Sequence, residues 1–121
     1  MSRHSVLRAA PPVVLGAIVG AGLRWFVASI MASLGALVAV NAVGCVVIGV
    51  VAARRPTPRV SMFVATGFCG GLTTLSSVVL EIAESLADAE LGRAVYVGAA
   101  VLSTSALGYV IGWNAAKTST P

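Results

Sequence analysis

Three features of this sequence place polar chemistry inside apolar segments. Arg24 lies within the first apolar run, Asn41 is the only strongly polar side chain of the second, and the third contains Gly67–Ser77, reading GFCGGLTTLSS. A charge or an amide in hydrocarbon needs a partner, and loosened backbone persists there only where protein, ion or water meets its N–H and C=O groups. We interpret Gly70 and Gly71 as helix breakers, and therefore expect an ion site or a subunit contact around them.

Membrane-spanning helices must position these groups. Hydrophobic residues make up 58% of the 121 positions and charged residues 10%, and the charges are separated from four apolar runs. About 20 helical residues cross a hydrocarbon core of roughly 30 Å, whereas barrel strands alternate over about ten residues. The sequence predicts an all-α membrane protein, with one four-helix domain over 1–121. The expected spans are 13–30, 34–53, 60–86 with a break near 70–75, and 94–113.

The basic residues at the ends of these spans predict the orientation of the chain. With four spans, both termini and the loop between the second and third spans share one side of the membrane. That side carries six basic residues, whereas the other side carries only Arg93. The six are Arg3, Arg8, Arg54, Arg55, Arg59 and Lys117. Because such an excess marks the cytoplasmic side, we expect a multi-pass protein with both termini in the cytoplasm.

Several other protein classes do not fit the sequence. The net charge of +4 does not indicate nucleic-acid binding, because the basic residues lie at segment ends rather than on one face among aromatics. No nucleophile, base and orienting group share a plausible spacing, so we do not expect an enzyme. We interpret Cys45 and Cys69 as packing residues, because both fall inside apolar runs without a nearby histidine. The first apolar run is too long for a cleaved signal peptide.

Some polar and small residues allow both a structural and a functional interpretation. Gly16, Gly20 and Arg24 recur every four residues, which predicts a close helix contact through the glycines. A functional role for Arg24 competes with snorkelling of its long side chain to the interface. Asn41 suits an interhelical hydrogen bond and a pore donor equally well. The hydroxyl of Thr104 either bonds back to its own helix or faces a pore.

The third apolar run carries a family resemblance. Its segment Gly67–Glu81, GFCGGLTTLSSVVLE, resembles the signature of the Fluc/CrcB fluoride channels, which is close to GFxGGxTTFSTFxxE. The order and spacing of Gly16, Gly20 and Arg24 agree with that family, as does the run NAVGCVVIG that starts at Asn41. The resemblance implies a bacterial inner-membrane dimer of two antiparallel subunits, with fluoride pores at the interface and a structural sodium ion at its centre.

The resemblance also implies roles for particular residues. The backbone carbonyls of Gly70 and Thr73 would hold the sodium ion. The fluoride pathway would include Asn41, Ser76, Ser77, Tyr96 and Thr104, with Arg24 in the vestibule and Glu81 closing the signature. Fluoride is small and strongly hydrated, so a selective path must replace its water with amide, hydroxyl and aromatic-edge donors.

The chain lacks both phenylalanines of the signature, which are replaced by Leu75 and Val78. Aliphatic side chains offer no electropositive edge to an anion, so a pore lined by them alone should conduct poorly. An antiparallel homodimer also needs a chain that inserts both ways, whereas six flanking basic residues against one predict a single orientation. We therefore expect one half of a heterodimeric fluoride channel that exports fluoride passively and lowers its toxicity in the cytoplasm.

Two other kinds of membrane protein are alternatives to a fluoride channel subunit. A non-conducting membrane assembly subunit would explain the missing phenylalanines. A small four-helix multidrug exporter would share the size of this chain, but proton-coupled drug export needs a carboxylate within the membrane, and the first two runs contain none.

Overall fold

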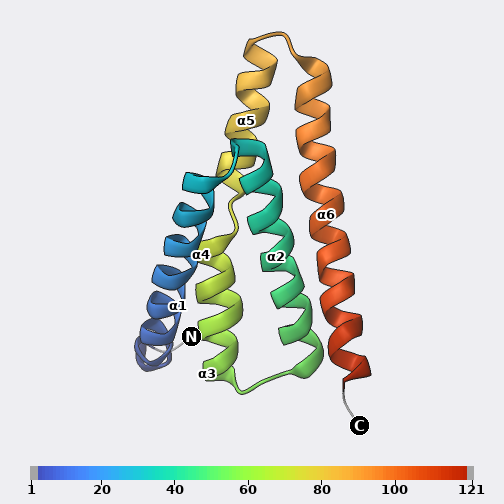
Figure 1. The fold of residues 1–121 in the computed structure, drawn as a ribbon. Helices are drawn as coiled ribbons and strands as arrows, with labels where there is room; N and C mark the ends of the chain where they lie inside the picture. The colour runs from blue at the N-terminus through green and yellow to red at the C-terminus, as the bar shows by residue number, and fades with distance from the viewer. Residues whose placement is uncertain (1–2, 120–121) are drawn as a thin grey trace.

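The computed structural model describes the backbone of residues 3–119 (Figure 1). Within that range every regular element is helical. The elements are α1 (Arg3–Ile30), α2 (Ser33–Arg54), α3 (Pro58–Ser61), the π-helix η1 (Met62–Cys69), α4 (Gly70–Leu72), α5 (Leu75–Ala87) and α6 (Leu91–Thr118). Four stretches are long and apolar enough to cross a membrane, namely Ala10–Ile30, Ser33–Arg54, Pro58–Ala87 and Leu91–Thr118. The prediction of an all-α membrane protein with four spans is therefore confirmed.

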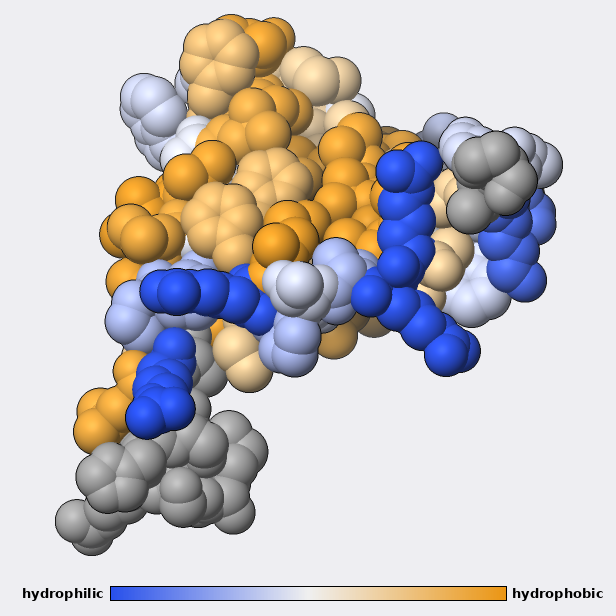
Figure 2. Space-filling model, turned by 90° about the horizontal axis from the view of Figure 1, so that it is seen from below, coloured by the Kyte–Doolittle hydropathy of each residue, from blue (hydrophilic) through white to orange (hydrophobic). Residues whose placement is uncertain are grey.

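The helices run up and down, and α1 and α2 meet in a turn beside α5, whereas α5 and α6 extend beyond it (Figure 1). Both chain ends and the α2–α3 connection lie at one end, and the turn between α5 and α6 lies at the other (Figure 1). The view from the end with the termini shows apolar side chains in the middle and hydrophilic ones beside them (Figure 2). Many large apolar side chains are exposed, as expected of helices that face lipid.

The third span is interrupted at Thr73 and Thr74. Both residues have extended backbone, with φ −78° and ψ 155° at Thr73 and φ −148° and ψ 110° at Thr74. The Thr73 hydroxyl donates to the carbonyl of Cys69 (2.8 Å), and the Thr74 hydroxyl accepts from the N–H of Ser77 (3.2 Å). Such side-chain bonds to nearby backbone end one helix and cap the next. The predicted break in this span is confirmed.

The glycines do not cause the break. Gly70 has right-handed helical backbone, with φ −63° and ψ −35°, and Gly71 lies within α4. Gly71 instead lets α4 approach α1, because a Cβ atom there would lie 3.0 Å from the Cα atom of Ala17. The initial interpretation of Gly70 and Gly71 as helix breakers is wrong, since a glycine in a well-packed helix can keep its geometry when a close neighbour requires the space.

Gly16 and Gly20 give α1 the close contact that their spacing predicts. A Cβ atom on Gly16 would meet the backbone at Gly67 and Phe68, and one on Gly20 would lie 2.8 Å from the nitrogen of Leu72 and even closer to the carbonyl oxygen of Phe68. Only glycine fits at these positions without a backbone shift. The pair therefore fixes α1 against η1 and α4, which brings the C-terminal half of α1 to the break.

A substitution on this face should loosen the fold. Gly20→Ala is expected to lower the free energy of unfolding by about 1–3 kcal/mol, because the added methyl group overpacks against backbone atoms that cannot move aside. Gly22→Ala is the matched control, since no atom lies within 4 Å of the position of its Cβ atom. Heating the protein in detergent and measuring the monodisperse fraction compares the two. Equal thermal stability of the two variants would contradict the close contact.

An ion pair joins the last two long helices near their turn. Arg93 Nη2 of α6 lies 2.6 Å from Glu81 Oε1 of α5, and Arg93 Nη1 lies 3.6 Å from Glu90 Oε2. The side chain of Glu81 is only 13% exposed, in contrast to the solvated acidic residues that follow it. The glutamate that closes the signature therefore links α5 to α6.

Candidate ion site at the helix break

Asn41 connects α2 to the broken span. Its side chain is buried, its Oδ1 atom accepts from the N–H of Thr74 (3.1 Å), and its Nδ2 atom donates to the carbonyl of Leu37 (2.8 Å). A hydrogen bond to another span, one of the two interpretations that the sequence leaves open, is thus present with backbone as the partner. The second hydrogen of Nδ2 takes part in neither bond, so the amide keeps one donor.

Removal of this amide should destabilise the break. Asn41→Ala leaves the buried N–H of Thr74 without its acceptor, which costs about 1–3 kcal/mol. We expect a lower thermal stability in detergent than for Asn114→Ala, an exposed asparagine on α6 that provides the same change in side-chain size. If Asn41→Ala is as stable as Asn114→Ala, Asn41 does not hold the break in place.

A cluster of hydroxyl groups opens α5. The Thr74 Oγ1 atom lies 2.8 Å from Ser77 Oγ and 3.3 Å from Ser76 Oγ. Thr74 is buried, whereas both serines are exposed in the single chain. The first turn of a helix also presents backbone N–H groups without intrahelical acceptors, together with the positive end of the helix dipole. These groups donate hydrogen bonds, so this end of α5 favours an anion over a cation.

Arg24 reaches the same break from α1. Its Nη1 atom donates to the carbonyl of Thr73 (3.3 Å), and the side chain is half-buried. The guanidinium therefore points toward the break rather than snorkelling to the nearer end of its helix. Most of its five N–H donors remain for other acceptors, because only one hydrogen bond is formed.

A pocket of about 380 Å³ brings these groups together. Its lining residues are Ala21, Arg24, Trp25, Ala28, Ser33, Ala36, Leu37, Val40, Thr74 and Ser77. A guanidinium and hydroxyl groups over an otherwise apolar wall form a donor-rich environment in which an anion can exchange water for hydrogen bonds. The sequence singled out Arg24 and Ser77 among these residues. It missed Trp25 and Ser33, whose only signal is their position beside Arg24 and at the start of the second span.

The backbone at the end of α4 has the donor set for a cation. In a continuous helix the N–H of Thr74 would bond the carbonyl of Gly70, but here it bonds Asn41. The Gly70 carbonyl thus lacks that partner, and the space above its Cα atom is open. The Thr73 carbonyl has two lone pairs, of which Arg24 takes one. Hard cations prefer such oxygens, and no cluster of histidine, cysteine or carboxylate ligands occurs in the described part of the chain.

The comparison with known families identifies the chain. Residues 12–114 match the family model described as CrcB-like protein, Camphor Resistance (CrcB). This chain belongs to the CrcB family. The resemblance that the signature of the third span indicates is thereby confirmed.

Several relatives of this CrcB chain carry a functional name. A protein of Pseudomonas aeruginosa (strain UCBPP-PA14), named fluoride-specific ion channel FluC, is 39% identical over 111 residues, which cover 83% of this chain and 87% of the relative. A protein of the same name from Chlorobium phaeobacteroides (strain BS1) is 38% identical over 86 residues, or 63% of this chain and 67% of the relative. One from Synechococcus sp. (strain CC9902), named fluoride-specific ion channel FluC 2, is 38% identical over 82 residues, covering 68% and 60% respectively.

Other residues of the CrcB signature and of α6 lie away from the pocket in the single chain. Tyr96 is 62% exposed, and the Thr104 hydroxyl donates to the carbonyl of Ala100 (2.6 Å), which is the bond back to its own helix. Leu75 is 74% exposed, whereas Val78 is buried in a core with Leu37, Val97 and Val101. The two positions that lack phenylalanine therefore face in different directions, one outward and one into the chain itself.

Proposed function

We propose that this CrcB chain is a subunit of a fluoride-selective channel, through which fluoride leaves the cell passively. The pocket that combines the Arg24 guanidinium with the Thr74 and Ser77 hydroxyls carries this proposal. Fluoride loses a large hydration energy on entering a membrane, and only a dense set of hydrogen-bond donors replaces it. The names of the three relatives agree with this chemistry.

We place the fluoride pathway along a set of polar residues around the break and on α6. They are Arg24, Asn41, Ser76, Ser77, Tyr96 and Thr104. Arg24 and Ser77 line the pocket, and Asn41 and Ser76 contact Thr74, which lines it too. Tyr96 and Thr104 would join the pathway only through a second subunit, because in the single chain Tyr96 is exposed and Thr104 bonds its own helix.

A second, inverted subunit of homologous sequence completes the channel in this proposal. Leu75 projects outward beside the exposed Ser76 and Ser77, on a surface that suits contact with another chain. It cannot offer the aromatic edge of the family signature to an anion. The basic residues at one membrane end also favour a single orientation of this chain, so an antiparallel partner would have the opposite charge bias.

We infer that the protein lies in the bacterial inner membrane with both termini in the cytoplasm. The exposed Arg8, Arg54, Arg55, Arg59 and Lys117 support this orientation. They belong to the end of the molecule where the chain begins and ends (Figure 1). A fluorescent protein fused to the C-terminus tests the orientation, because green fluorescent protein folds in the cytoplasm. A C-terminal fusion that does not fluoresce, together with an active alkaline phosphatase fusion at the same end, would indicate the opposite orientation.

We further propose that the carbonyls of Gly70 and Thr73 hold a sodium ion. When bound, the ion would neutralise the negative end of α4 and supply positive charge close to the anion path. We expect a higher thermal stability in sodium chloride than in N-methylglucamine chloride at equal ionic strength. Equal melting temperatures in the two salts would count against the ion.

Selectivity measurements separate the proposed function from its alternatives. Liposomes with this chain and its partner should release fluoride at least 100-fold faster than chloride. Chloride binds hydrogen-bond donors more weakly than fluoride does, so a narrow path rich in such donors stabilises fluoride more than chloride. A multidrug exporter would instead give cells resistance to quaternary ammonium compounds. A non-conducting assembly subunit would leave the fluoride permeability of its partner unchanged.

A further inference from the structure

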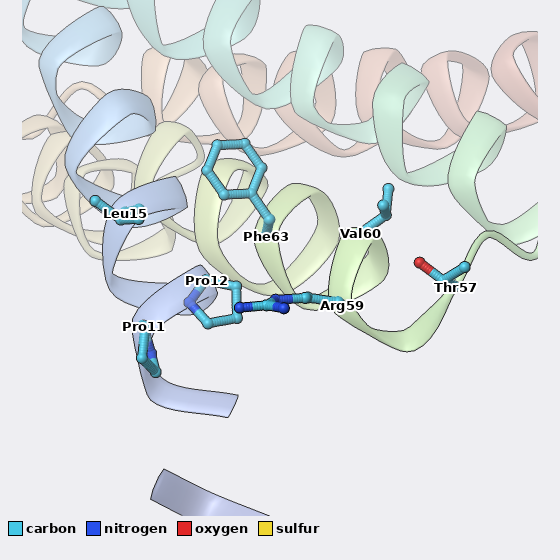
Figure 3. A pocket seen from close by; sticks show the side chains of 7 residues that line it. All are labelled: Pro11, Pro12, Leu15, Thr57, Arg59, Val60 and Phe63. Atoms are coloured by element: carbon cyan, nitrogen blue, oxygen red, sulfur yellow. The ribbon is translucent and has the colours of Figure 1, made fainter. Parts of the chain in front are cut away.

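A second pocket lies at the end of the molecule that holds both termini (Figure 3). It has a volume of about 400 Å³ and lies between α1 and the start of the third span. Its lining residues are Pro11, Pro12, Leu15, Thr57, Arg59, Val60 and Phe63. Phe63 precedes the break at Thr73 by roughly 15 Å of helical rise, so the pocket is separate from the ion site.

Among the residues that the structure describes, Arg59 is the only charged one that lines this pocket. Its side chain extends from α3 toward Pro12 of α1 along one edge of the pocket (Figure 3). Among the described residues the only ion pairs are those of Arg93, so the guanidinium of Arg59 has no carboxylate partner. All four acidic residues belong to positions 81–90, near the turn at the opposite end of the molecule. Arg59 thus keeps its full hydrogen-bonding capacity over an apolar groove.

We propose that this pocket binds one anionic phospholipid of the adjacent leaflet. The phosphate would bind the Arg59 guanidinium, and an acyl chain would lie against Leu15, Val60 and Phe63. Arg8 and Arg55 add positive charge at the same membrane end, which attracts anionic rather than neutral headgroups. A neutral lipid would fill the groove but leave the charge of Arg59 without a counterion. This inference does not depend on the ion that the channel carries.

Native mass spectrometry of the detergent-solubilised full chain tests the site. After addition of equal amounts of dioleoyl phosphatidylglycerol and dioleoyl phosphatidylcholine, we expect one retained phosphatidylglycerol per chain. Arg59→Gln should weaken its retention about fivefold, the change expected for one basic residue near a phosphate. Arg54→Gln is the matched control, since it removes the same charge from the same end without lining the pocket. It should change retention less than twofold.

Two further variants separate the two parts of the site. Arg59→Lys keeps the charge and should retain phosphatidylglycerol better than Arg59→Gln. Leu15→Trp fills the groove from an exposed position on α1 and should weaken retention although Arg59 is intact. Equal losses in Arg59→Gln and Arg54→Gln would overturn the proposal in favour of diffuse surface charge. Equal retention of the two lipids by the native chain would overturn it too, as would loss of the lipid when the partner chain binds.

Discussion

Arg24→Gln is expected to lower fluoride flux through the assembled channel by about 10- to 100-fold. A hydrogen bond from a charged donor contributes about 1.5–3 kcal/mol, and each 1.4 kcal/mol changes a rate tenfold. Arg24 is the only charged residue of its apolar run and lines the pocket with Ser77. Glutamine keeps two N–H donors but removes the charge that draws an anion into a low-dielectric site. The fluoride flux of Arg24→Lys should lie between those of the native channel and of Arg24→Gln, because lysine keeps the charge without the planar set of donors.

A fluoride electrode outside liposomes that hold this chain and its partner measures the effect. Arg8→Gln is the control, because Arg8 is exposed on the same helix and lies before the membrane span. Its flux should stay within twofold of the native value. An Arg24→Gln channel that conducts like the native one would show that Arg24 does not contact the anion. A similar loss in both variants would point to a general effect of surface charge.

The sequence predicted the spans well and the break only in outline. A continuous apolar run in a bilayer must pair its backbone polar groups within itself, as a helix does, so the four helices follow from hydropathy alone. The break lies within the expected window, but Thr73 and Thr74 form it, not the glycines. Glycine and threonine both weaken a helix, and only the packing of α1 against Gly71 shows which of them the fold uses for contact and which for the turn.

Single polar residues in apolar runs led to much of the candidate site. Arg24, Asn41 and Ser77 stand out because hydrocarbon penalises an unpaired polar group. Their partners could not be predicted, because the Thr73 carbonyl and the Thr74 N–H become available only once the helix is interrupted. Composition says nothing about which backbone groups the interruption releases. The hydrogen bonds of Arg24 and Asn41 to neighbouring residues of the break therefore depend on the tertiary structure.

Adding the proposed partner chain should have an effect of similar size. This chain by itself is expected to conduct fluoride about 5- to 100-fold more slowly than the chain with its partner, since two aromatic-edge contacts of about 0.5–1.5 kcal/mol each are missing. Leu75 is exposed at a position where the family signature has phenylalanine, and Val78 is buried against Val97 and Val101, where it packs the chain's own core. Neither side chain can replace the missing edges.

Fluoride efflux from three liposome preparations tests this account most directly. One contains this chain alone, one contains a homologous four-span chain with the opposite charge bias and phenylalanines at the positions of Leu75 and Val78, and one contains both in equal amounts. We predict rapid efflux from the preparation with both chains and about 5- to 100-fold slower efflux from this chain alone. Efflux from this chain alone at the rate of the pair would contradict the account.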